Sequence, residues 1–207
     1  NLASESNVEK STLNPVYCLK NNYDIAVNMF EFARNCKNLE LFIQMSTDEV
    51  YGEALPNSSH KEWSPIVPCN PYSEKFIPKI IQKISSEQEV PIYSCNNIIG
   101  SRVYLHAQNL ADALIFISEI QPKNNTNWFP DRYNICGNNE INNLELAQLI
   151  ADIMGKELKY KLTSSQSNRP GYDKKYALNG EKIKKLGWKP PLTLLESLER
   201  IVNYYIN

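Results

Sequence analysis

A hydroxyl group and two carboxylates occupy consecutive positions in one short segment, STDEVYG at residues 46–52. The segment follows an apolar run at residues 39–45, which predicts a buried strand with a polar carboxyl-terminal end. Ligands of open α/β sheets bind outside that end of the strands. Two neighbouring carboxyl groups can act as acid and base when their environments separate their pKa values. Thr47, Asp48 and Glu49 are therefore candidates for acid–base chemistry on a bound ligand.

The same segment also allows a structural interpretation. Ser46 and Glu49 have the spacing of a helix capping box, in which two side chains satisfy the backbone of the first turn. Residues 50–52, Val-Tyr-Gly, are a poor start for a helix. Taken alone, the segment leaves both interpretations open.

The composition indicates a globular protein that recognises its partners locally. The 207 residues are 42% hydrophobic and 22% charged, with 22 basic and 23 acidic residues and a net charge of -1. This balance gives no electrostatic reason to bind nucleic acid or an anionic membrane. No apolar stretch approaches the roughly 20 residues of a membrane span, and residues 1–10 lack the features of a signal peptide. We expect a cytoplasmic protein.

Neither the cysteines nor the histidines predict a metal site. The five cysteines are an odd number at wide spacing, without a C-x-x-C pair: Cys18, Cys36, Cys69, Cys95 and Cys136. We expect reduced, half-buried thiols. His106, Asp112 and Glu119 do not form the cluster that a zinc site requires. No metal is therefore expected.

Helical and strand patterns alternate along the chain. Apolar spacing and start signals predict helices at residues 14–36, 110–120, 144–154 and 181–186, and a last helix after the capping box at 193–196. Short apolar runs predict strands at residues 39–45, 91–93, 103–106 and 132–135. The first helix and strand form half of a βαβ unit, and the later elements predict a smaller α+β domain packed on it.

STDEVYG resembles the signature of dTDP-glucose and UDP-glucose 4,6-dehydratases, which are extended short-chain dehydrogenases. Related epimerases and decarboxylases keep Val-Tyr-Gly but usually lack Asp-Glu before it. Further segments similar to the family follow in family order over essentially the whole chain: LASES (2–6), NPYS (70–73), EKFIP (74–78), PIY (91–93), RYNI (132–135), RPGYD (169–173) and LGWKP (186–190).

The resemblance implies a Rossmann-type fold, the cofactor NAD and a hydro-lyase reaction on a nucleotide-activated glucose. In that reaction NAD removes hydride from sugar C4, water leaves across C5 and C6, and hydride returns to C6. Tyr72 matches the tyrosine that takes the C4 hydroxyl proton, and its phenol requires a nearby lysine to lower its pKa. Glu49 matches the C5 base and Asp48 the acid at C6, while Thr47 bonds the sugar near C4.

Family positions imply two sets of binding residues. Cofactor contacts are expected from Leu2, Ala3, Ser4, Glu5, Ser6, Asn21 and Tyr72. Nucleotide-sugar contacts are expected from Ser6, Thr47, Lys75, Ile77, Pro78, Pro91, Ile92, Tyr93, Arg102, Asn134, Arg169 and Tyr172. The two arginines suit the diphosphate, because guanidinium is a planar, permanently charged donor. A homodimer is also implied, with the helix at residues 14–36 in the interface.

The resemblance breaks in two places. The family has lysine four residues after its tyrosine, whereas Lys75 lies only three residues after Tyr72. A helix and a strand are therefore expected to be missing between Ser73 and Glu74. The chain also lacks the G-x-x-G-x-x-G fingerprint of the cofactor domain.

Two explanations of the break are open. Either the sequence joins parts of a longer polypeptide, or the protein is a truncated, inactive relative. We expect a partial NAD-binding domain at residues 1–73 and a mostly nucleotide-sugar-binding domain at 74–207. Alternative functions are a nucleotide-sugar 4-epimerase or decarboxylase, or a non-catalytic sugar-nucleotide binding protein.

Overall fold

A computed structural model describes residues 1–5, 13–55, 57–68, 76–96, 98–120, 130–164 and 175–206 of the 207-residue chain. Within these ranges it has mixed α/β structure with parallel strand pairs, which confirms the predicted fold class. The described residues contain no helix that is long and apolar enough to cross a membrane.

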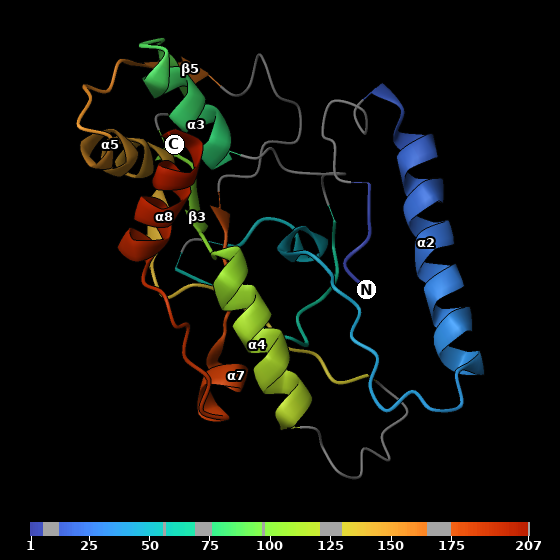
Figure 1. Cartoon of the computed structure of the whole chain (residues 1–207). Coiled ribbons are helices and arrows are strands. Elements are labelled where there is room, and N and C mark those ends of the chain that lie inside the picture. Colours follow the sequence, from blue (N-terminus) through green and yellow to red (C-terminus); the bar gives the residue numbers. More distant parts are fainter. Residues whose placement is uncertain are drawn as a thin grey trace.

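The first long helix, α2 (Pro15–Asn35), confirms the helix predicted at residues 14–36. Asn14 caps it, because its side-chain oxygen accepts a hydrogen bond from the backbone nitrogen of Tyr17 at 3.2 Å. Proline at the first helical position needs no hydrogen-bond partner for its nitrogen. Helix α2 lies at one side of the molecule, apart from α3, α5 and α8 (Figure 1).

The prediction of a buried strand at residues 39–45 is wrong. This run is extended but has no strand partner among the described residues. Its backbone forms hydrogen bonds with Asn1 instead. The nitrogen of Asn1 donates to the oxygen of Ile43 at 2.6 Å, and the nitrogen of Met45 donates to the oxygen of Asn1 at 3.0 Å. A strand forms only beside another strand that completes its hydrogen bonds, and a single residue cannot do so.

The strands form two sheets of three. In one sheet, β1 (Val90–Cys95) lies between β2 (Ile98–Ile99), which is antiparallel, and β5 (Tyr160–Ser164), which is parallel. In the other, β3 (Ser101–Val103) lies between antiparallel β4 (Glu140–Asn142) and parallel β6 (Lys175–Tyr176). The predicted strand at 91–93 is confirmed, whereas the one at 103–106 overlaps β3 only at Val103.

The strand predicted at residues 132–135 is also wrong, because this segment is irregular. A side chain satisfies part of its backbone: the nitrogen of Asn134 donates to Oε1 of Glu62 at 3.1 Å. The segment thus takes an irregular path in which a buried carboxylate, rather than a neighbouring strand, accepts a backbone hydrogen bond.

The remaining predicted helices are confirmed with small shifts of their ends. They are α4 (Ala107–Glu119), α5 (Asn143–Ile153), α7 (Glu181–Lys185) and α8 (Leu194–Ile206); α3 (Phe76–Ser85) is an additional helix. The capping box of α8 forms as expected. The backbone nitrogen of Thr193 donates to Glu196 Oε2 at 2.8 Å, and the nitrogen of Glu196 donates to Thr193 Oγ1 at 3.3 Å.

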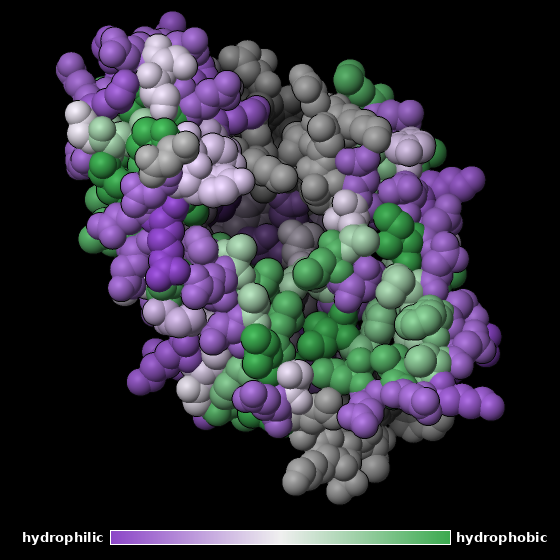
Figure 2. Space-filling model, viewed as in Figure 1, coloured by the Kyte–Doolittle hydropathy of each residue, from purple (hydrophilic) through white to green (hydrophobic). Residues whose placement is uncertain are grey.

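Two hydrophobic clusters hold the elements together. The larger joins α3, β1, α5 and α8 through fully buried side chains that include Ile80, Ile92, Leu146 and Leu198. The smaller joins α4 and α7 around Ala113, Ile183 and Trp188, and Ile43 of the extended run packs against it. Figure 2 shows hydrophobic side chains gathered over α4 and the extended run beside it.

Candidate active site

The segment STDEVYG forms a single turn of 3₁₀-helix, η1 (Asp48–Tyr51). Thr47 caps the turn, because its Oγ1 accepts a hydrogen bond from the backbone nitrogen of Glu49 at 3.4 Å. Gly52 ends it with a φ of 73°, a left-handed conformation that favours glycine. The capping interpretation is thus right in part: a turn begins here, but Thr47 rather than Ser46 caps it.

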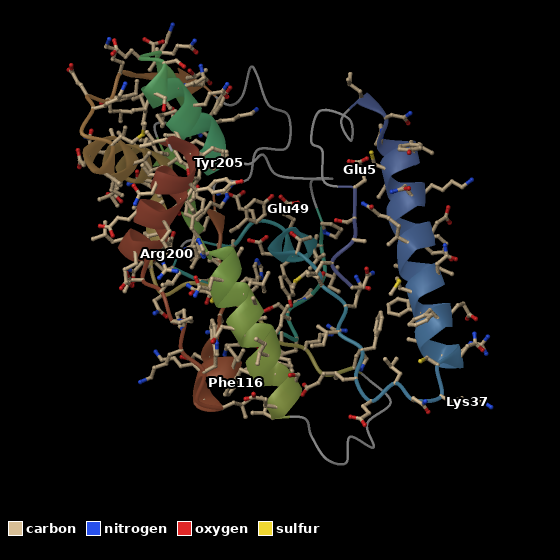
Figure 3. All side chains as sticks on the ribbon, in the orientation of Figure 1. Glu5, Lys37, Glu49, Phe116, Arg200 and Tyr205 are labelled. Atoms are coloured by element: carbon tan, nitrogen blue, oxygen red, sulfur yellow. The ribbon has the colours of Figure 1, made fainter. Side chains whose placement is uncertain are left out.

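The three predicted catalytic residues of this turn differ in burial. Glu49 is 5% exposed, whereas Asp48 is half-buried and Thr47 is exposed. The hydroxyl of Thr47 also donates to Asp48 Oδ1 at 3.2 Å. Figure 3 shows Glu49 in the middle of the molecule, between α2 on one side and α3, α4 and α8 on the other. Unequal burial of adjacent carboxyl groups is the condition for assigning them opposite proton-transfer roles.

An aromatic stack supports the turn. The rings of Tyr51 and His60 are nearly parallel at 14°, with their centroids 5.2 Å apart. The hydroxyl of Tyr51 donates to Asn134 Oδ1 at 3.4 Å. Burial raises the pKa of Tyr51; the charge of Arg132 opposes this rise and that of Glu62 adds to it. The phenol therefore stays protonated, and its hydrogen remains in place as a donor.

Asn134, a predicted substrate residue, is 5% exposed and lies in a buried polar network. Its Nδ2 donates to the backbone oxygen of His60 at 2.8 Å and to that of Asn179 at 3.3 Å. Its backbone bonds to Glu62, which is 4% exposed. These contacts hold the loop after the turn, and a substrate contact from Asn134 stays a prediction.

Backbone hydrogen bonds connect the turn to the second sheet. The nitrogen of Ala54 donates to the oxygen of Lys175 at 3.0 Å, and the nitrogen of His60 donates to that of Ala177 at 2.8 Å. His60 also forms an isolated parallel bridge with Leu178. The acidic turn and strand β6 are therefore held in a fixed relation.

A second cluster of charges lies beside Asn134. Asp131 forms an ion pair with Lys182. Burial favours a raised pKa for Asp131, but hydrogen bonds from Lys182 and Tyr133 outweigh burial and lower it. Burial and the bond to Asp131 raise the pKa of Tyr133 to about 12. Lys182 also lies 4.2 Å from the centre of the Tyr133 ring. This cluster fixes the loop and adds no group to the acidic turn.

Arg102, the predicted diphosphate residue, lies on β3 and is half-buried. Its Nη1 donates to the backbone oxygen of Ser101 at 2.7 Å. Its guanidinium carbon lies 4.4 Å from the ring centroid of Tyr176 on strand β6. Sequence reasoning missed Tyr176, because the pairing of β3 with β6 joins residues far apart in the chain.

The segment predicted to line the nicotinamide is held by α2. The backbone nitrogen of Glu5 donates to Asn22 Oδ1 at 2.6 Å, and Asn22 Nδ2 donates to the oxygen of Glu5 at 3.2 Å. Residues 2–4 are exposed. Asn22 thus anchors Glu5 to α2. Asn21, the neighbouring residue that was predicted to contact the cofactor, is half-buried on the same helix. Figure 3 shows Glu5 beside α2.

The other predicted nucleotide residues lie on α3 and β1. Ile77, Pro78, Pro91 and Tyr93 are half-buried, whereas Ile92 is completely buried in the larger cluster. A nucleotide contact predicted for Ile92 would therefore have to come from its backbone, because its side chain is buried. Five predicted site residues lie outside the described part of the chain: Ser6, Tyr72, Lys75, Arg169 and Tyr172.

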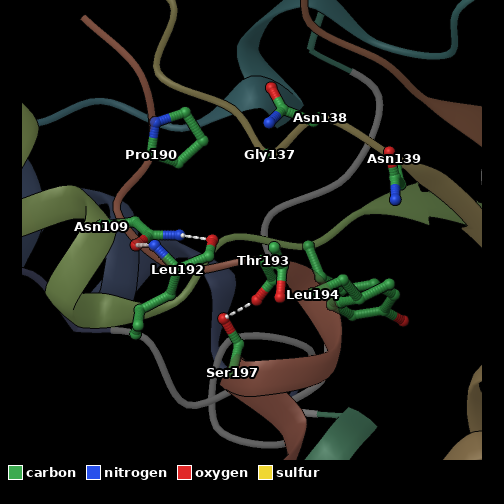
Figure 4. A pocket seen from close by; sticks show the side chains of 10 residues that line it. Asn109, Gly137, Asn138, Asn139, Pro190, Leu192, Thr193, Leu194 and Ser197 are labelled. Carbon is green, nitrogen blue, oxygen red and sulfur yellow. Dashed lines mark hydrogen bonds between the residues drawn. The ribbon is translucent and has the colours of Figure 1, made fainter.

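A separate pocket of about 220 Å³ lies where the start of α8 meets α4 (Figure 4). Asn109 closes one side by exchanging hydrogen bonds with the backbone of Leu192 at 2.9 and 3.0 Å. Ser197 donates to the oxygen of Thr193 at 2.6 Å. No predicted site residue lines this pocket. Within the described ranges, no group of three or more acidic, histidine or cysteine residues could hold a metal ion.

The chain is similar to known sugar-nucleotide dehydratases. The family model for GDP-mannose 4,6 dehydratase matches residues 1–75. The dTDP-glucose 4,6-dehydratase 1 of Escherichia coli is 27% identical, and the match covers 100% of this chain and 71% of that protein. Its alignment extends over 266 positions against the 207 residues of this chain, so at least 59 positions have no counterpart here.

Solved structures of similar fold include both dehydratases and epimerases. The dTDP-glucose 4,6-dehydratase of Bacillus anthracis, in complex with NAD, is 25% identical with a TM-score of 0.64, covering 78% of this chain and 60% of that one. The UDP-glucose 4-epimerase of Thermus thermophilus is 17% identical with a TM-score of 0.81, covering 99% of this chain and 76% of that one. By the family-model match over residues 1–75, the dehydratase relatives and these solved structures, the chain is similar to NAD-dependent epimerases and dehydratases.

Proposed function

We propose that the protein dehydrates a nucleotide-activated glucose, dTDP-glucose or UDP-glucose, to the 4-keto-6-deoxy sugar nucleotide with NAD as cofactor. One observation carries the proposal: the adjacent carboxyl groups of Asp48 and Glu49 lie on a capped turn and differ in burial. Elimination of water requires a base at C5 and an acid at C6, and this pair provides both. The 27% identity to the Escherichia coli dehydratase supports the same reaction.

Each residue of the turn has a proposed part in the reaction. The exposed hydroxyl of Thr47 bonds the sugar near its C4 hydroxyl. Glu49 removes the C5 proton, and its burial favours the neutral acid that this step produces. Asp48 protonates the departing C6 hydroxyl. Tyr72 takes the C4 hydroxyl proton in the preceding oxidation.

The described residues fit the nicotinamide side of NAD. Residues 2–4 are exposed, and the half-buried Glu5 that follows them is fixed by two backbone hydrogen bonds that it exchanges with the Asn22 side chain. When bound, NAD supplies the acceptor and later the donor of the hydride. We assign this task to residues 1–73 and the nucleotide sugar to residues 74–207, with Arg102 on its diphosphate.

The active protein is proposed to contain a helix and a strand between Ser73 and Glu74 that this sequence lacks. The family-model match ends at residue 75, beside the junction at Ser73 and Glu74. Leu39 and Leu41 on the extended run are 38% and 36% exposed, and this run has no strand partner among the described residues. Both observations support a helix and a strand at this junction that pack on residues 39–45 in the active protein.

A 4-epimerase is the second candidate, because epimerases share the fold. Epimerisation at C4 requires no acid and base across C5 and C6, so the paired carboxyl groups favour dehydration. Protein expressed from the complete coding sequence should be incubated with NAD and each glucose nucleotide, and the product followed by proton NMR. The proposal predicts a new C6 methyl signal. A C4 epimer or a pentose without that methyl group would refute it.

A further inference from the structure

Arg102 lies against an aromatic ring that the neighbouring strand supplies. In the parallel pairing of β3 with β6, Arg102 is directly opposite Tyr176. Directly paired residues place their side chains on the same face of a sheet. The guanidinium carbon is 4.4 Å from the ring centroid, which is within the range of a cation–π contact. Tyr176 is only 4% exposed, so packing fixes the ring on which the guanidinium rests.

Stacking orients the guanidinium without using its donors. The N–H groups of arginine lie in the plane of the guanidinium, so an aromatic ring on its flat face leaves them at the edge. One of them, on Nη1, donates to the backbone oxygen of Ser101 at 2.7 Å. A ring contact and a backbone hydrogen bond together fix both the plane of the group and its rotation within that plane. A phosphate is best bound by a guanidinium held in this way, because the bidentate contact requires a defined plane.

The strands that carry the pair are braced across the sheet. Lys175, beside Tyr176 on β6, forms an ion pair with Glu140 of β4 at 2.9 Å. Ser101, beside Arg102 on β3, donates to the same carboxylate at 2.5 Å. One carboxylate therefore connects all three strands, and it holds β3 and β6 in the register that places the guanidinium over the ring.

We infer that Tyr176 is a positioning residue that orients Arg102 toward the diphosphate of the nucleotide sugar. The inference rests on the proposed function in one respect, namely that Arg102 binds that diphosphate. Tyr176 would have no direct contact with the ligand. By orienting Arg102, it would determine how much the second phosphate contributes to the binding affinity.

Nucleotide binding by the full chain tests this role without a requirement for turnover. Isothermal titration calorimetry gives the dissociation constants for dTDP and dTMP, and in parallel for UDP and UMP. The dissociation constant of the monophosphate divided by that of the diphosphate measures the contribution of the second phosphate. We expect Tyr176→Leu to reduce this ratio about three- to tenfold, as expected for the loss of a cation–π contact, with little change for the monophosphate. Tyr176→Phe keeps the ring and should keep the ratio.

Combination with Arg102→Ala separates positioning from general support of the fold. If Tyr176 acts through Arg102, then Tyr176→Leu should lower the ratio no further once Arg102 is alanine. Equal weakening of monophosphate and diphosphate by Tyr176→Leu, or an unchanged ratio, would overturn the inference while leaving the proposed function intact. No preference of the wild type for the diphosphate, or none lost in Arg102→Ala, would overturn both the inference and the assigned role of Arg102.

Discussion

Asp48 and Glu49 are neighbours in sequence, yet they meet different surroundings. In a 3₁₀-helix with three residues per turn, successive side chains point about 120° apart. Glu49 accordingly faces the interior, whereas Asp48 stays within reach of the Thr47 hydroxyl. A short capped turn is therefore enough to give two identical functional groups different environments.

Arg102→Ala should weaken substrate binding more than turnover. A diphosphate contact is made equally in the ground and transition states, so its loss raises KM and leaves kcat nearly unchanged. The loss of a charge-assisted hydrogen bond corresponds to a rise of roughly ten- to a hundredfold. Steady-state kinetics would measure it, with Arg200→Ala as the control, since Arg200 donates to Gln108 on an exposed surface. A large fall in kcat at unchanged KM would contradict the assigned role.

Sequence located the catalytic candidates of the turn because they are consecutive. The sequence could not predict the residues that hold the turn and the loop beside it in place. His60 stacks on Tyr51 from nine positions away, and Glu62 reaches the backbone of Asn134 across 72 positions. Such contacts depend on how loops meet in three dimensions, and no local pattern of residue types encodes them.

Among the elements, the brace across β3, β4 and β6 has a pH dependence. Hydrogen bonds from Ser101 and then Lys175 lower the pKa of Glu140. A lowered pKa stabilises the folded state above the ordinary pKa of the group, and this stability is lost as the pH falls through the folded value. The Glu140 side chain is 39% exposed, so we expect Glu140→Gln to cost less than about 1 kcal/mol at neutral pH.

Chemical denaturation of wild type and Glu140→Gln would measure this difference. It should shrink as the pH falls through the lowered pKa of Glu140, where the wild-type carboxylate takes up its proton. Glu199→Gln on α8 serves as a matched control. A difference that is independent of pH would show that the ion pair and the charge-assisted bond contribute nothing.

Helices could be predicted from sequence and strands only in part. Helices α5 and α8 follow from apolar spacing and from caps whose donors and acceptors lie within three residues. A strand depends on a partner that local sequence does not name. Residues 91–93 find a partner in β5, whereas the runs at 39–45 and 132–135 find none in the described structure.

At the scale of the whole molecule, α2 carries a row of exposed apolar side chains along one face. Val16, Tyr23, Val27 and Phe30 recur at intervals of three to seven residues, and they are 74%, 68%, 37% and 50% exposed. Contiguous exposed apolar surface of this kind marks an interface. We expect a homodimer in which α2 packs against its copy, as the family resemblance implies.

Light scattering at micromolar concentration would test the dimer. The wild type should have twice the mass of the chain, and Tyr23→Glu should shift it toward the monomer by placing a charge in the interface. Tyr204→Glu, at a position 80% exposed on α8, should leave the dimer intact. A monomeric wild type would remove this part of the account.

The most direct test of the central claim is the separation of oxidation from elimination in Glu49→Gln. If Glu49 removes the C5 proton, the variant should still bind NAD and substrate and still oxidise C4. The near-ultraviolet absorbance of reduced nicotinamide should therefore accumulate on the enzyme, while 4-keto-6-deoxy product falls about 10²- to 10⁴-fold. Glu53→Gln, an exposed neighbour of the turn, should behave as wild type, and Tyr72→Phe should suppress both signals. Normal turnover by Glu49→Gln would contradict the assignment of Asp48 and Glu49 as the acid and base of a dehydratase.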